Sequence, residues 1–143
     1  MHLRILVAAA VLSSAIVTGT AFAAAPTKIK VSLLGEGGAG MEIKLSQASV
    51  KAGKVEFDVT NDAITESHEV VLVKLKSPDQ AIPVVKDKHR VDEGRLQSFG
   101  EVPDLKAGEH GKLVVTLKPG AYELLCNIKG HYESGMHTVL TVK

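Results

Sequence analysis

The sequence predicts an all-β protein, a two-sheet antiparallel sandwich, and two observations carry this prediction. Short runs rich in apolar and β-branched residues recur along the chain, at residues 29–33, 41–45, 55–59, 70–75, 113–117, 122–125 and 138–142. Such runs are typical of β-strands. Turn signals built on glycine or proline separate several of the runs, at residues 35–38, 51–53, 106–108 and 118–120. Short strands with turns at this spacing favour a sandwich.

Alternation along the strands predicts which side chains face the core. In the run 55–59, Val55, Phe57 and Val59 share one side of the strand, while charged residues occupy the other. Because successive side chains of a strand point to opposite faces, we expect these three residues to be buried. In the run 122–125 and the residue after it, Tyr122, Leu124 and Cys126 alternate along the chain and so share one face. The sequence does not establish that this second face is the core.

The stretch 77–96 breaks the strand rhythm. It contains Pro78, Pro83 and Gly94 within a dense mixture of acidic and basic side chains. We predict a long crossover with one helical turn and a solvated charged face. Excursions of this kind connect the two sheets of Greek-key sandwiches.

The N-terminus predicts export. Arg4 precedes a small-apolar run over residues 5–17, and a small-x-small site follows at residues 21–23. We therefore predict a signal peptide over residues 1–23, a single domain over residues 24–143 and a location in the periplasm or outside the cell. The apolar run is short for a bilayer span, although an uncleaved membrane anchor is the alternative.

The charge balance argues against nucleic acid as a partner. Arg4 is the only charged residue lost with the predicted signal, so 16 of the 17 basic side chains remain against 16 acidic ones. A balanced chain gives no indication of nucleic-acid binding. We expect a monomer with no membrane span after signal cleavage.

The single cysteine, Cys126, is the first indication of chemistry. It has no second cysteine in the chain with which to form a disulfide, and exported proteins meet an oxidising compartment. A lone thiol there is buried and inert, paired between chains, or bound to a metal. His131 and Met136 follow Cys126 at successive intervals of five residues, between one predicted strand and the next. Because the segment is loop-like, these three side chains can converge on one metal ion.

His68, at the entry to the apolar run 70–75, is the best candidate for a fourth ligand. Two imidazoles and a thiolate with a weak axial thioether are what a blue-copper electron-transfer site requires. Zinc competes for Cys and His but seldom uses Met. Met136 could instead be a core residue, because methionine fills gaps in apolar interiors.

These motifs resemble those of the cupredoxin family, the blue or type 1 copper proteins such as plastocyanin and azurin. The resemblance rests on residues 102–109, on residues 118–122, on the segment from Cys126 to Met136, and on His68. It implies an eight-stranded Greek-key β-sandwich, one type 1 copper per chain and one-electron transfer between transient redox partner proteins. By motif, His68 takes the place of the N-terminal histidine ligand. Cys126, His131 and Met136 take the places of the loop cysteine, the loop histidine and the axial methionine.

Two residues depart from the pattern of many family members, which have Asn after the first histidine and Ser or Thr after the cysteine. This chain has Glu69 and Asn127 there. We predict that Glu69 and Asn127 join the two ligand segments through a carboxylate–amide hydrogen bond. Outside the ligand set, Ile128 and Tyr132 are candidate contacts for a partner beside His131. Tyr122, after the turn at 118–120, is predicted to form a tyrosine-corner hydrogen bond.

Three functions remain open at this point. The first is a periplasmic or secreted one-electron carrier that uses the Cu(I)/Cu(II) couple. The second is a periplasmic copper-binding protein for buffering or delivery, and the third is a metal-free secreted β-sandwich adhesion module. We expect no enzyme, because the sequence shows neither an additional histidine cluster for a second copper nor a defensible catalytic triad or carboxylate pair.

Overall fold

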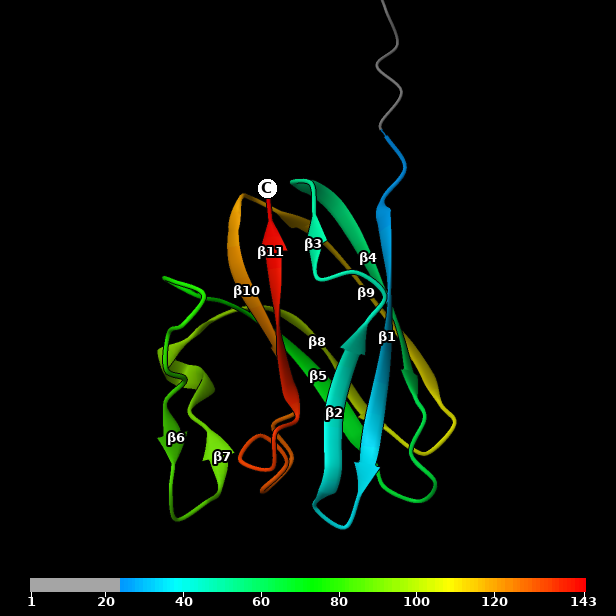
Figure 1. Ribbon diagram of the computed structural model, residues 1–143, viewed down its shortest axis with the longest axis vertical. Coiled ribbons are helices and arrows are strands. Elements are labelled where there is room, and N and C mark those ends of the chain that lie inside the picture. Colours follow the sequence, from blue (N-terminus) through cyan, green and yellow to red (C-terminus); the bar gives the residue numbers. More distant parts are fainter. Residues whose placement is uncertain (1–23) are drawn as a thin grey trace, which may run out of the picture.

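The computed structural model describes residues 24–143, so the predicted signal peptide lies outside the described residues. Two sheets face each other, with a small hairpin at one side (Figure 1). The strands are β1 Thr27–Glu36, β2 Ala39–Leu45, β3 Ser49–Val50, β4 Gly53–Asn61, β5 His68–Lys74, β6 Val84–Val85, β7 Arg90–Val91, β8 Gln97–Leu105, β9 His110–Leu117, β10 Gly120–Leu125 and β11 His137–Val142. A short 3-10 helix, η1, spans Glu93–Arg95. The predicted Greek-key sandwich of about eight strands is confirmed, because eight of these strands are longer than two residues.

The first sheet has the order β2-β1-β4-β9. The central pair, β1 and β4, runs parallel, and β9 and β2 flank it in antiparallel register. The prediction of a purely antiparallel sandwich is therefore wrong, and β3 also runs parallel to its neighbour β11 in the second sheet. The predicted inward face of β4 is confirmed, since Val55, Phe57 and Val59 are fully buried. Each such side chain contributes roughly 1.5–3 kcal/mol through its burial.

The second sheet has the order β3-β11-β10-β5-β8 and carries the candidate ligands. One face packs against the first sheet, and Tyr122, Leu124 and Cys126 all lie in this core. The opposite face is buried as well, because the segment with β6, β7 and η1 folds over it and covers Val71, Val73 and Leu125. Strand β10 is therefore buried on both faces, which the alternation in the sequence did not indicate.

The seven predicted strands are all present, and β8 is the long strand that the sequence analysis missed. It contains Gly100 and Pro103, and only Val102 and Leu105 are buried along its nine residues. It forms the edge of its sheet. Proline is tolerated there because an edge strand has one side on which no N–H donor is needed for strand pairing. The predicted crossover between the sheets is wrong, because the segment 77–96 joins β5 to β8, which are paired neighbours in the second sheet. The segment does contain one helical turn, η1, as predicted, together with the unpredicted hairpin β6–β7.

Within the described part of the chain, no helix has the length and apolar character that a membrane crossing requires.

Candidate metal centre

Strand pairing brings the four predicted ligands to one end of the sandwich. His68 is the first residue of β5, Cys126 directly follows β10, and Met136 directly precedes β11. Strand β10 pairs antiparallel with both β5 and β11, so the three residues lie at the same end of the sheet. The loop between β10 and β11 lies at the end of the molecule opposite the C-terminus (Figure 1).

Backbone hydrogen bonds hold this ligand loop in a compact shape. The Cys126 N–H donates to the Met136 carbonyl over 3.0 Å, which closes the loop at its base. Within it, the His131 N–H donates to the Ile128 carbonyl and the Met136 N–H donates to the His131 carbonyl, each over 3.0 Å. His131 is thereby held between the two sulfur-bearing residues rather than free to swing away.

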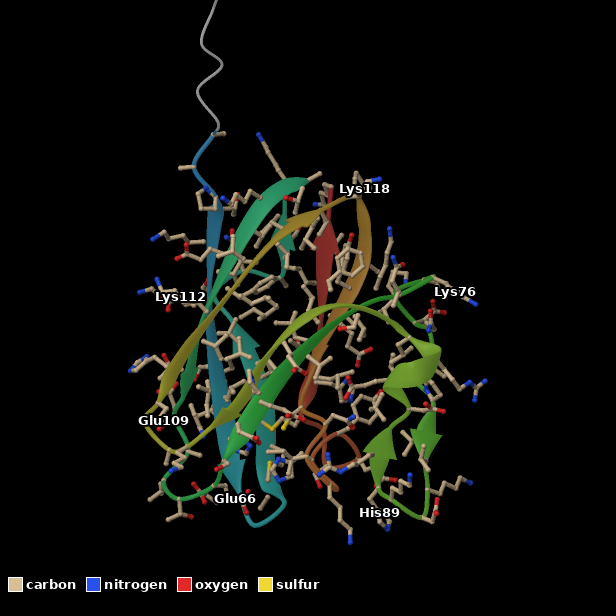
Figure 2. All side chains as sticks on the ribbon, turned by 180° about the vertical axis from the view of Figure 1, so that it is seen from behind. Glu66, Lys76, His89, Glu109, Lys112 and Lys118 are labelled. Atoms are coloured by element: carbon tan, nitrogen blue, oxygen red, sulfur yellow. The ribbon has the colours of Figure 1, made fainter. Side chains whose placement is uncertain are left out.

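The donor atoms of His68, Cys126 and His131 converge. The two Nδ1 atoms of His68 and His131 are 3.2 Å apart, and Cys126 Sγ lies 3.5 Å from His131 Nδ1. All three donor atoms lie within 4.8 Å of one another. His68, Cys126 and Met136 are completely buried, whereas the His131 side chain keeps 13% of its surface exposed. In Figure 2 the sulfur atoms gather at this end of the molecule, between the labelled Glu66 and His89.

The chemistry of this donor set fits a soft metal ion. Burial raises the pKa of the Cys126 thiol to about 11, and burial together with the neighbouring His68 lowers the pKa of His131. The His131 imidazole is therefore favoured in the neutral form that binds metal, and a cation is needed to stabilise the Cys126 thiolate. Thiolate and imidazole ligands suit copper and zinc, and the thioether of Met136 beside them favours copper.

The tautomer of His68 is fixed by the first sheet. His68 Nε2 lies 3.2 Å from the carbonyl oxygen of Gly35, at the end of β1, and donates its proton there. Nδ1 is then left with the lone pair that a metal requires. Gly35 has φ +128°, and a Cβ at this position would lie 2.6 Å from Met41 Sδ. Only glycine fits at position 35. The hydrogen bond to His68 uses the backbone carbonyl of Gly35, so no side chain in the sequence indicated this contact.

Glu69 and Asn127 do join the two ligand segments, but not through the predicted side-chain amide. The backbone N–H of Asn127 donates to Glu69 Oε1 over 3.0 Å. Burial raises the pKa of the Glu69 carboxyl, and this hydrogen bond acts in the opposite direction. Glu69 follows His68 directly and Asn127 follows Cys126 directly, so the contact links the two ligands through their chain neighbours.

The side-chain amide of Asn127 instead holds the segment that covers the second sheet. Its Oδ1 accepts from the Val91 N–H over 2.6 Å, and its Nδ2 donates to the Val91 carbonyl over 3.1 Å. Nδ2 also donates to Glu93 Oε1 over 2.6 Å. Asn127 is buried, and both of its bonds to Val91 form away from water, whereas the bond to Glu93 is partly buried. The residue after the cysteine therefore has every hydrogen-bonding group of its side chain engaged.

The His131 side of the centre is built differently, and sequence analysis did not single out the residue beside it. Glu66, in the loop between β4 and β5, places Oε2 3.8 Å from His131 Nε2. Its other oxygen, Oε1, accepts from the Gly37 N–H over 2.8 Å. A clue was available in the position of Glu66 two residues before His68, but the sequence does not reveal that the β4–β5 loop folds toward His131.

Ile128 and Tyr132, the predicted partner contacts, are both partly buried. Ile128 packs against the core between the sheets. Tyr132 packs against the second cluster and stacks on His137, with ring centroids 4.5 Å apart. Burial raises the pKa of Tyr132 to about 12, so its hydroxyl stays neutral.

A family model described as copper binding proteins of the plastocyanin/azurin family matches residues 29–143. No curated protein sequence matches the chain.

Several solved structures share its fold. Dithionite-reduced auracyanin from the photosynthetic bacterium Roseiflexus castenholzii is 22% identical with a TM-score of 0.59, and the match covers 84% of this chain and 99% of that one. Rusticyanin from Thiobacillus ferrooxidans is 15% identical with a TM-score of 0.59, covering 81% and 76%. Auracyanin A, a "blue" copper protein from Chloroflexus aurantiacus, is 19% identical with a TM-score of 0.58, covering 83% and 100%. At these identities the likeness shows the fold.

Proposed function

The chain belongs to the plastocyanin/azurin family of copper-binding proteins, with one copper site per chain, and from this premise we propose that it carries single electrons between partner proteins. The observation that supports this function most directly is the convergence of His68, Cys126 and His131 within 4.8 Å at a buried position. His68, Cys126 and His131 would hold the copper, and Met136 would supply a weaker thioether contact. When bound, copper supplies a one-electron couple between Cu(I) and Cu(II).

The protein's own residues contribute rigidity and exclusion of water. Three of the four side chains are completely buried, and the loop from Cys126 to Met136 is closed by backbone hydrogen bonds. A donor set held in this way changes little when the charge at its centre changes by one, which is what fast electron exchange needs. The partly exposed edge of His131 is the part of the donor set nearest to solvent, and we assign the electron path to it.

A carrier rather than an enzyme is supported by the number of such clusters. In residues 24–143, the His68, Cys126 and His131 group is the one group of three His, Cys or carboxylate side chains close enough to hold a metal. Copper enzymes that reduce a substrate need a second metal centre to bind it. We place the protein in the periplasm or outside the cell, which the predicted signal peptide over residues 1–23 supports.

A copper titration with a visible spectrum tests this function. Mature protein given Cu(II) should develop an intense thiolate-to-copper charge-transfer band, saturate at one copper per chain, and bleach reversibly on mild reduction. A colourless protein would instead support the metal-free adhesion module. Two or more tightly bound coppers, or copper that cannot be cycled between oxidation states, would support buffering or delivery.

The proposed partner contact at Ile128 and Tyr132 has its own test. Either residue replaced by a charged one should slow electron exchange with a redox partner and leave the spectrum unchanged. Because both side chains also pack against the interior, a matched exposed control is Lys129→Glu on the same loop. Equal slowing in the control would indicate a general charge effect rather than an apolar contact.

A further inference from the structure

One oxygen of Glu66 has no hydrogen-bond partner among the described residues, although it is buried. This atom, Oε2, is shielded from solvent while the Glu66 side chain as a whole is 30% exposed. A buried carboxylate oxygen without a partner costs free energy, so its position needs an explanation. The imidazole nitrogen His131 Nε2 lies 3.8 Å from this oxygen.

The loop that carries Glu66 is fixed by contacts on its other sides. Glu66 Oε1 accepts from the Gly37 N–H over 2.8 Å, and the Glu66 carbonyl accepts from Asn61 Nδ2 over 2.8 Å. Glu36 accepts from the backbone N–H and from the hydroxyl of Thr65, the preceding residue. With one oxygen and the backbone held in this way, the second oxygen is directed at His131 by the fold and not by chance rotation.

The proton on His131 must face this oxygen when the ligand is in use. His131 Nδ1 is the nitrogen that points toward Cys126 Sγ and His68 Nδ1, at 3.5 and 3.2 Å, so Nδ1 is the atom available to a metal. A neutral imidazole with its lone pair on Nδ1 carries its proton on Nε2. Nε2 is therefore a donor, and Glu66 Oε2 is the acceptor directed toward it, slightly beyond hydrogen-bond distance.

We propose that Glu66 is a positioning residue that accepts a hydrogen bond from the Nε2–H of His131 and lowers the reduction potential of the centre. This inference rests on the proposed function, because a reduction potential presupposes bound copper. A carboxylate bonded to the far nitrogen orients the ring and makes its ligating nitrogen more basic. Its negative charge also favours the more highly charged oxidation state of the metal.

Two neighbouring carboxylates are already committed elsewhere. Glu69 uses Oε1 for the Asn127 N–H, and Glu133, on the ligand loop, pairs with His89 over 2.8 Å. Glu66 is thus the carboxylate that the structure directs at His131, and Glu133→Gln is a matched control. It removes the same charge two residues from His131 without touching the ring.

The first experiment measures the potential of copper-loaded Glu66→Gln. Glutamine keeps the shape and can still accept from Gly37, but it lacks the charge. We expect the ratio of reduced to oxidised protein at a fixed applied potential to rise about tenfold, which is a shift of 59 mV for one electron. Glu133→Gln should shift the ratio by less than about twofold, since exposed charges are screened by solvent. Equal shifts in the two variants, or no shift in Glu66→Gln, would overturn the proposal.

A second experiment uses the unsubstituted protein, so its result does not depend on whether a variant folds. In protein loaded with Zn(II), which is diamagnetic, the imidazole Nε2–H of His131 should give a slowly exchanging proton resonance by NMR. A proton that exchanges with water as fast as that of an exposed imidazole would overturn the proposal. Failure of the proposed function is distinguishable, because a protein that binds copper without the charge-transfer band would contradict the carrier assignment whatever Glu66 does.

Discussion

The two sides of the metal centre are supported in different ways. On the Cys126 side, the next residue, Asn127, is buried and makes four hydrogen bonds to Glu69, Val91 and Glu93. On the His131 side, the one directed neighbour is a carboxylate, Glu66, at 3.8 Å. The first arrangement ties together three segments that are distant in sequence, and the second places a charge beside a ring.

We infer from this difference that the Cys126 side holds the metal ligands in place, whereas the His131 side adjusts the reduction potential. A closed network of buried hydrogen bonds is costly to break, so the Cys126 side should control stability and metal retention. A single carboxylate that is partly exposed contributes little to folding, so the His131 side should control the reduction potential. Substitutions on the two sides should therefore change different measured quantities.

The largest expected effect is the loss of the thiolate. Cys126→Ser replaces a soft anionic donor by a hydroxyl, so the intense charge-transfer band should vanish completely, and any copper that remains should behave as an ordinary nitrogen-and-oxygen site. Electronic and electron paramagnetic resonance spectra of the copper-loaded variant measure this. A variant that stayed intensely coloured would show that Cys126 is not a ligand.

Asn127→Ala should give the next largest effect, and it acts on stability. The substitution leaves the buried N–H and carbonyl of Val91 without their partner, and buried groups left unpaired cost about 1–3 kcal/mol each, whereas the partly buried carboxylate of Glu93 is open to water. We expect the free energy of unfolding of the copper-free protein to fall by about 2–4 kcal/mol. Urea denaturation measures it. Glu66→Gln is the control from the other side and should stay within about 0.5 kcal/mol of the original protein. Equal losses would remove the distinction between the two sides.

The sequence allowed the ligands and the link between Glu69 and Asn127 to be predicted, but not the other supports. The equal spacing of Cys126, His131 and Met136 is a side-chain pattern within one loop, and seven strands carried regular apolar runs. The supports use other groups. Gly35 acts through its carbonyl and Val91 through its peptide group, and a backbone group has the same chemistry at every residue.

The missed elements have a related physical cause. Strand β8 lies at a sheet edge, contains proline and glycine, and buries few side chains, so it lacks the alternation that indicates a strand. Hairpin β6–β7 covers the outer face of the second sheet, and its place depends on contacts with residues far along the chain. Local periodicity does not encode such contacts.

Met136→Gln should change the potential while leaving the plane of ligands in place. A harder axial oxygen stabilises Cu(II), so the colour should persist and the ratio of reduced to oxidised protein at a fixed potential should fall about tenfold, or 59 mV. Voltammetry of the copper-loaded variant measures this shift, which is opposite in sign to that expected for Glu66→Gln. An unchanged potential, or no copper binding, would mean that Met136 is not the axial ligand. His137 would be tested next, although it pairs with Glu123 at 2.8 Å.

Tyr122→Phe should have the smallest effect and should be confined to stability. The hydroxyl of Tyr122 donates to the Lys118 carbonyl over 2.9 Å, the predicted tyrosine corner, near the start of the strand that ends beside Cys126. Phenylalanine keeps the buried ring and its edge-to-face contact with Phe99, so only this hydrogen bond is lost, at a cost of about 1 kcal/mol. Because the residues between Tyr122 and Cys126 are paired on both sides within the sheet, the change should not reach the ligand loop. Urea denaturation should therefore detect a loss while the spectrum and the potential stay the same. A shifted potential would show that the donor set responds to changes throughout β10, and the division between a fixing side and a tuning side would then fail.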